Sequence, residues 1–406
     1  MSDPSQRGRN LGIAAGAAAA ALFAIFDLYQ WAVAYASDHF HNDFTFYFVA
    51  ARIGITHGWP SIYDLHLQQA GLDALGSRIT VAELARYISP PPVAWLALPL
   101  TALPYPVAYW IWSGLLVMAL VCVWYMAAPA AGRVRVIFLA AAFGWLPVIY
   151  ALQLGQPGLL VALGVAGAYA LVRANRPWLA GIALGAIALK PQLAFLVPLA
   201  LLAAGQSRAF AGSVITLGAL AGLSAVALGG AGTNEYLARL NFAASVPVNR
   251  ELTLAYVLGD AARPVQIFIA AWTMLIVYRA RGRGLEWPFV CALVGGTLAT
   301  PYVHLDDLMM LGLAGWLLLR TNSPRWTGAY VLAAVIAIEG EPIWGPAPVI
   351  ACELGALGLL SVAALKHDDR HAQEHGAERK HDARLERDRQ HEAVDGQPEA
   401  VDVHRA

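Results

Sequence analysis

The sequence predicts an all-α membrane protein, a polytopic transmembrane bundle of about 10–13 spans. Of its 406 residues, 58% are hydrophobic and only 13% are charged, whereas soluble domains carry about 25% charged residues. The charge is also uneven, because residues 366–406 hold 19 of the 54 charged side chains. This composition excludes a soluble enzyme. A net charge of zero without a basic patch excludes nucleic acid as a partner.

Residues 11–36 form the first predicted span, since they are apolar except for Asp27 and Gln30. A crossing needs roughly 20 residues, and the apolar core of a signal peptide has roughly 7–15, so an anchor helix is favoured over a cleaved signal. Eleven further apolar segments lie at 105–128, 136–152, 158–173, 178–189, 191–204, 209–228, 264–279, 285–300, 307–320, 326–340 and 346–365.

Arginines predict the orientation, because basic residues in short connections are retained in the cytoplasm. If successive segments cross the membrane in alternating directions, the C-terminal tail and most arginine clusters lie on the same side of the membrane. These clusters are Arg7/Arg9, Arg133/Arg135, Arg173/Arg176, Arg208, Arg279/Arg281/Arg283 and Arg320/Arg325. We therefore expect a multi-pass protein of the inner (plasma) membrane with both termini cytoplasmic. Residues 1–10 form the cytoplasmic N-terminus, and residues 11–365 form the membrane domain. A loop at about 37–104 lies on the outer face.

This outer-face loop is predicted to contain amphipathic helices that lie on the bilayer surface. Helical spacing of apolar residues marks 43–56, and two shorter helices are expected at 64–76 and 80–87. The tail, 366–406, has few apolar residues and holds six of the eleven histidines. We expect it to be disordered.

Two consecutive segments, 178–189 and 191–204, are too short to cross about 30 Å of hydrocarbon as straight helices. Irregular backbone at membrane depth is tolerated only where protein or water satisfies its polar groups. These segments are therefore expected to line a hydrated pocket that opens to the outer face.

Lys190 lies between these two segments and is the only lysine in the first 365 residues. An ionisable residue at membrane depth indicates a functional site, and an ammonium group suits an anionic ligand such as a phosphate. The alternative is a lysine that snorkels to the interface. Apolar residues on both sides of Lys190 favour the functional interpretation.

Asp43 follows the first span on the outer face, in DHFHNDFTFYFVAAR. Its carboxylate could act as a general base, or it could cap the helix that begins there. Spacing alone favours the cap. Asp38 is a weaker candidate of the same kind.

The segment ATPYVHLDDLMML places His304, Asp306 and Asp307 within four residues, a pattern that suits phosphate or metal binding. No further His or carboxylate stands at a ligand spacing, so no metal site is expected. Gln156, in LQLGQPG, is expected to supply hydrogen bonds at the same outer rim, with a plain turn as the alternative.

Five motifs lie in order within residues 27–320: DFTFYFVAAR followed by GWPSIYD, SPPPVAWLALPLTALP, LQLGQPGLL, AGIALGAIALKPQLAFLVPLAL and ATPYVHLDDLMML. Their order resembles that of the polyprenol-phosphate-mannose-dependent mannosyltransferases of glycosyltransferase family 87, in the GT-C superfamily. The resemblance implies a GT-C type bundle in which Asp43 matches the catalytic aspartate. It also implies that Lys190 and His304 lie near the donor phosphate. Further residues of these motifs that are expected to bind substrate are Gln156, Arg52 and Asp306.

The implied activity moves a sugar, mannose by this resemblance, from a polyprenyl-phosphate donor to a hydroxyl of a lipid-linked or glycan acceptor. Asp43 would act as the general base on the extracytoplasmic face, and the anomeric configuration would invert. No cofactor is implied, although the carboxylates leave room for a divalent metal. Membrane lipids are expected partners. The alternative is a secondary transporter or lipid flippase with a midplane site at Lys190.

Overall fold

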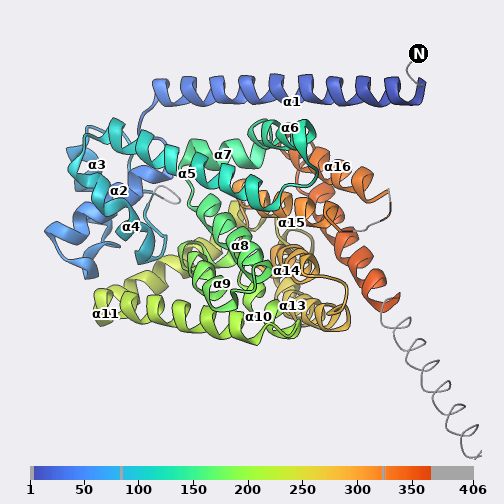
Figure 1. The fold of residues 1–406 in the computed structure, drawn as a ribbon. Helices are drawn as coiled ribbons and strands as arrows, with labels where there is room; N and C mark the ends of the chain where they lie inside the picture. The colour runs from blue at the N-terminus through green and yellow to red at the C-terminus, as the bar shows by residue number, and fades with distance from the viewer. Residues whose placement is uncertain (1–3, 83–85, 322–323, 325, 367–406) are drawn as a thin grey trace, which may run out of the picture.

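The computed structural model describes residues 4–82, 86–321, 324 and 326–366. In these ranges the chain folds into α-helices joined by turns and short 3-10 helices (Figure 1), which confirms the prediction of an all-α membrane bundle. The predicted tail lies outside the described residues, apart from Lys366.

The first half of the chain contains α1 (Pro4–Ser37), α2 (Asp43–Thr56), α3 (Leu65–Ala74), α4 (Pro91–Ala97), α5 (Tyr105–Ala127), α6 (Gly132–Phe143), α7 (Leu146–Leu154), α8 (Gly158–Arg173), α9 (Pro177–Ala183) and α10 (Leu196–Ala203). The second half contains α11 (Ser207–Ser245), α12 (Ala255–Leu258), α13 (Ala262–Arg279), α14 (Glu286–Ala299), α15 (Met309–Leu319), α16 (Trp326–Glu339), α17 (Glu341–Trp344) and a last helix, Ala347–Lys366.

Among the described residues, five helices are long and apolar enough to cross a membrane, or six if the bent pair α6 and α7 forms one span. The five are Leu11–Ser37, Tyr105–Ala127, Ser207–Ser245, Ala255–Arg279 and Ala347–Lys366. The sequence predicted about 10–13 spans. The difference lies in shorter apolar helices such as α14, whose 14 residues extend over only about 21 Å.

α1 lies across one side of the bundle in Figure 1 and packs against α6 and α7. Gly144, between these two helices, permits the close approach, because a Cβ there would lie 2.8 Å from the backbone nitrogen of Ala24. Elsewhere α1 exposes large apolar side chains, including Leu22 at 68% and Phe26 at 58%. Such a surface suits contact with lipid, as expected for an anchor helix.

The predicted outer loop forms a compact unit of helices at one end of the molecule (Figure 1). α2 has the predicted bounds, and α3 falls within the predicted 64–76. However, α2 is buried along most of its length, from Phe44 to Ala51, so it packs inside this unit instead of lying on the bilayer surface. The reason is that α3, α4 and the turn at Trp59–Ser61 surround it.

The third predicted helix, at 80–87, is not helical at its described residues, 80–82 and 86–87; residues 83–85 lie outside the description. Two side chains of α3 bind backbone amides of this segment. Gln69 Oε1 accepts a hydrogen bond from the Val81 amide at 2.8 Å, and Gln68 Oε1 accepts one from the Tyr87 amide at 2.9 Å. The local helical pattern was therefore overridden by tertiary hydrogen bonds.

The chain is irregular around Lys190, as the two short segments predicted. α9 continues into a 3-10 helix (Leu184–Leu189), and a second 3-10 turn (Pro191–Leu193) precedes α10. Lys190 itself has φ −151° and ψ 79°, outside the helical region, because the proline that follows disfavours helical backbone at the preceding residue. The break turns the Lys190 side chain towards the interior.

α11 is longer than the predicted 209–228 and bends at Gly229, where φ is +61°. This conformation strains any residue with a Cβ. Helix continues beyond the bend to Ser245, so part of the predicted connection after residue 229 is helical.

Figure 1 shows the start of α1 and the end of the last helix on one side of the molecule, with α2–α4 on the opposite side. This arrangement leads to a labelling test of the predicted orientation. A cysteine at exposed Ala74 should react with an impermeant thiol reagent in intact cells. A cysteine at exposed Ser207 should react only after lysis. Mass-tag gel shifts against the unsubstituted chain measure both reactions, and the reverse pattern would invert the topology.

Candidate functional site

Asp43 is the first residue of α2, but the N-cap of this helix is the residue before it, Asn42. Asn42 Oδ1 accepts a hydrogen bond from the Thr45 amide at 3.1 Å, as an N-cap side chain does. Tyr105 holds Asn42 in place, since the Asn42 amide donates to the Tyr105 hydroxyl at 3.1 Å. The capping interpretation of Asp43 is therefore wrong, and its partly exposed side chain is directed to another partner.

That partner is Gln156, whose Nε2 donates a hydrogen bond to Asp43 Oδ2. Gln156 follows the left-handed residue Gly155, which has φ +69° and ends α7. The backbone is fixed on both sides of this turn. Trp112 Nε1 donates to the Gly155 carbonyl at 2.8 Å, and the Gln156 amide donates to the Ala151 carbonyl at 2.8 Å.

The other end of the Gln156 side chain faces Lys190. Lys190 Nζ donates to Gln156 Oε1 at 3.0 Å and to Asp306 Oδ2 at 2.8 Å, and it forms a close ion pair with Asp307 Oδ1. Lys190 is only 8% exposed, so it is not a snorkelling side chain. Its charge is compensated inside the protein by two carboxylates.

Both carboxylates come from the 3-10 turn Leu305–Leu308, which precedes α15. Asp306 is fully buried and Asp307 is 2% exposed. Asp307 Oδ2 accepts a hydrogen bond from the His304 amide at 3.0 Å, which secures the start of the turn. One oxygen of Asp306, Oδ1, is buried without a hydrogen-bond partner among the described residues.

The His304 ring contacts Asn249, in the 3-10 helix Pro247–Arg250, with Nε2 2.6 Å from Asn249 Oδ1. Asn249 Nδ2 donates to the Ala243 carbonyl at 2.6 Å, so its oxygen must face His304. His304 Nε2 therefore carries the proton of this hydrogen bond.

The pKa values of the three carboxylates are shifted in different directions: those of Asp43 and Asp307 are raised, and that of Asp306 is lowered. Burial, and then the nearby charge of Asp306, raise the pKa of Asp43 to about 7. Burial also raises the pKa of Asp307 to about 7. For Asp306, burial acts in the same direction, but attraction to Lys190 prevails and its pKa falls below the ordinary value.

The structure thus joins the side chains of four of the six predicted site residues in one set of polar contacts: Asp43, Gln156, Lys190 and Asp306. His304 is connected to this set only through its backbone amide, which donates to Asp307. The sixth, Arg52, lies nine residues after Asp43 on α2, which is about two and a half turns and hence the opposite face. It is exposed there and does not join the contacts.

Sequence reasoning missed Asn249 and Tyr47. Tyr47 lies one helical turn after Asp43, and its hydroxyl is 3.4 Å from Gln156 Oε1. The spacing of four residues on a predicted helix could have indicated it. Nothing in the local pattern around Asn249 marks it. Among the described residues, no group of three or more His, Cys, Asp or Glu is placed to hold a metal ion.

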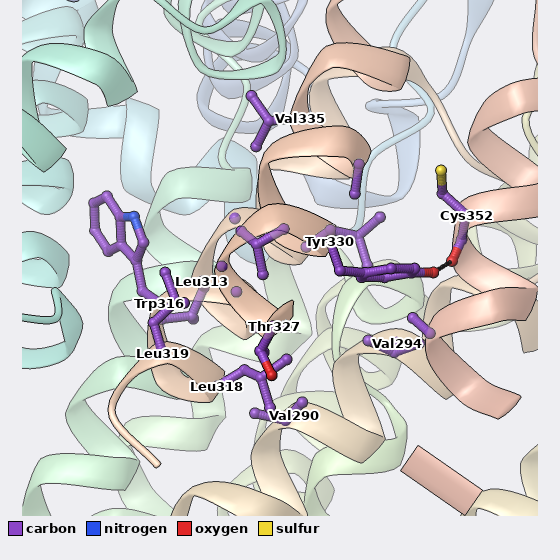
Figure 2. Close-up of a pocket in the computed structure, with 18 of the residues that line it drawn as sticks. Val290, Val294, Leu313, Trp316, Leu318, Leu319, Thr327, Tyr330, Val335 and Cys352 are labelled. Carbon is purple, nitrogen blue, oxygen red and sulfur yellow. Dashed lines mark hydrogen bonds between the residues drawn. The ribbon is translucent and has the colours of Figure 1, made fainter. Parts of the chain in front are cut away.

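A large cavity of about 1170 Å³ lies elsewhere, among α14, α15, α16 and the last helix (Figure 2). Its wall is mostly apolar, with Val290, Leu313 and Trp316 among the lining residues. The hydrated pocket was expected along 178–204, and no residue of that range lines this cavity.

The ion cluster leads to a stability prediction. Lys190→Met leaves two buried carboxylates uncompensated, which should cost about 3–5 kcal/mol of unfolding free energy. Adding Asp306→Asn and Asp307→Asn should recover much of this loss. Thermal unfolding in detergent measures both, with Lys366→Met as the control because Lys366 is exposed. Equal stability of Lys190→Met and wild type would show that the cluster does not support the fold.

A family comparison covers the middle of the chain. The model of glycosyltransferase family 87 matches residues 87–303, more than half of the sequence. This range includes Gln156, Lys190 and Asn249, whereas Asp43 precedes it and Asp306 follows it. No curated protein and no solved structure matches. With its membrane-spanning helices, the chain is a multi-pass membrane protein that belongs to glycosyltransferase family 87.

Proposed function

We propose that this protein transfers a sugar, mannose in our proposal, from a polyprenyl-phosphate donor to a hydroxyl of a lipid-linked or glycan acceptor. Transfer takes place at the extracytoplasmic face of the inner (plasma) membrane, with inversion at the anomeric carbon. The observation that carries the proposal is the position of Asp43. Asp43 is a partly exposed residue, its carboxyl is not used as a helix cap, and one carboxyl oxygen is held by Gln156.

Asp43 acts as the general base. A pKa of about 7 suits this role, because a base works best when its pKa lies near the operating pH. Gln156 binds Oδ2, which leaves Oδ1 without a hydrogen-bond partner among the described residues. An acceptor hydroxyl can therefore hydrogen-bond to Oδ1.

The reaction is a single displacement. The acceptor oxygen attacks the anomeric carbon, and its proton passes to Asp43. The bond between the anomeric carbon and the phosphate oxygen breaks, and its electron pair leaves with the polyprenyl phosphate. Attack in line with the leaving group inverts the configuration. The described residues need to supply only a base, orientation and charge compensation for the phosphate.

His304 and Lys190 lie near the donor phosphate in this proposal. Lys190 and its two carboxylates together carry one negative charge when all are ionised, and this charge would repel the donor. A proton on Asp307, whose pKa burial raises to about 7, leaves Lys190 and Asp306 as a neutral pair. Burial lowers the pKa of His304, and a phosphate beside the ring would favour its protonated form.

The transporter alternative also uses a buried lysine at a helix break. Membership of a glycosyltransferase family favours the transferase.

The donor class can be tested without a membrane gradient. The purified protein in detergent should move labelled mannose from a polyprenyl-phosphate donor to an extracted lipid or glycan acceptor. It should not use a nucleotide sugar, and a β-linked donor should give an α-linked product. Product analysis by mass spectrometry and NMR decides both points. Transfer from the nucleotide sugar alone would overturn the proposed donor.

Asp43→Asn tests the base, because it keeps the shape but removes the basicity. We expect turnover to fall by roughly two to four decades, with little change in melting temperature. On the acidic side, the wild-type kcat/KM should rise as Asp43, whose pKa is about 7, loses its proton. On the alkaline side, it should fall as Asp307 ionises and the cluster becomes negative.

Asp38→Asn is the control, because Asp38 lies five residues earlier on the same loop and binds the Phe40 amide at 3.0 Å. Activity in Asp43→Asn together with its loss in Asp38→Asn would move the base to Asp38. Full activity in both variants would refute the mechanism.

A further inference from the structure

Gln156 connects the buried cation to the proposed base, and its amide can take only one orientation there. The Lys190 ammonium has three donors and no acceptor, so the Gln156 atom 3.0 Å from it must be the oxygen. The amide nitrogen then faces Asp43 Oδ2. An amide flip would place two donors face to face and an oxygen against the carboxylate.

The cation that sets this orientation is itself held in place. Asp306 and Asp307 bind Lys190 from one side, and both belong to a short turn whose amide at His304 is fixed by Asp307. The backbone of Gln156 is fixed by its hydrogen bond to Ala151. Both ends of the connection are therefore rigid, and Gln156 is 7% exposed, so water competes little for its amide.

We propose that Gln156 is a positioning residue, which uses the Lys190 ammonium to present an N–H to Asp43. The donated hydrogen bond fixes the rotamer of the carboxylate and directs Oδ1 to the acceptor hydroxyl. It also stabilises the ionised form of Asp43, because a donor favours the charged state of the group that accepts from it. The inference rests on the proposed role of Asp43 as the base. In it, Gln156 positions the Asp43 carboxylate and does not bind the substrate.

A change at Gln156 should therefore move the pH at which Asp43 becomes active. The charged and titratable groups that face Asp43 are Tyr47, Tyr150, Lys190, Tyr302 and Asp306. Asp306 opposes ionisation of Asp43, and Lys190 favours it. Without the hydrogen bond from Gln156, this balance shifts towards the protonated acid.

The test is the pH profile of kcat/KM for sugar transfer in the full-length protein. Gln156→Glu keeps the shape and an acceptor for Lys190, but it loses the donor and adds a negative charge beside Asp43. Gln156→Leu removes the hydrogen bond without adding charge. In Gln156→Leu the acidic limb should move up by about one to two pH units, as expected for a lost hydrogen bond to an ionised group. In Gln156→Glu it should move up further, because the added negative charge also opposes ionisation of Asp43. Gln153→Leu, one turn earlier on α7, is the matched control and should keep the wild-type limb.

A merely structural role would lower activity at every pH and leave the limb unchanged. That result in either folded variant would overturn the positioning role. Gln156→Met has nearly the length of glutamine, has no donor and adds no charge, so it provides the measurement if Gln156→Leu does not fold. Failure of the proposed function is distinguishable, because it appears as activity in Asp43→Asn. An inactive Asp43→Asn with an unshifted Gln156→Glu would refute only this inference.

Discussion

The polar core of this protein depends on one buried ammonium group. A lysine that is 8% exposed in so apolar a chain is costly unless it is paired and hydrogen-bonded. Asp306 and Asp307 compensate its charge, and the Gln156 oxygen takes a further donor. The ion cluster therefore requires three regions of the chain to meet: the end of α7, the break between α9 and α10, and the turn before α15. The same requirement brings Gln156 against Asp43.

The broken helices follow from this requirement. A straight helix through Lys190 would satisfy its own backbone but would not present the side chain to the turn at residues 305–308. Pro191 ends the first 3-10 segment, and the extended backbone of Lys190 changes the direction of the chain. On the opposite side of the cluster, Gly155 adopts the left-handed conformation that lets Gln156 leave α7 and face inwards. The irregular backbone at Lys190 and at Gly155 thus allows both segments to contact the same ion cluster.

Much of this could be predicted from the sequence, for reasons that are local. Apolar periodicity gave the bounds of α2, and the isolated Lys190 next to a proline indicated both the break and a polar centre. The Gln156 contact with Asp43 could not be predicted, because no local pattern encodes a contact between residues 113 positions apart. For the same reason, the surface location expected for α2 and the helix expected at 80–87 were wrong, since surrounding helices and glutamine side chains decided both. Among the described residues, fewer helices are long enough to cross a membrane than the roughly 10–13 spans predicted, because apolar composition does not determine helix length.

The sequence separation within the ion cluster has a consequence for synthesis. Lys190 emerges from the ribosome 116 residues before Asp306, which corresponds to a delay on the order of ten seconds at the usual rate of translation. During this time Lys190 lacks the two carboxylates that compensate its charge in the folded protein. The ion cluster of Lys190 can therefore form only after the turn that carries the carboxylates has been synthesised. This part of the polar core is therefore completed late, after most of the candidate membrane-spanning helices have been synthesised.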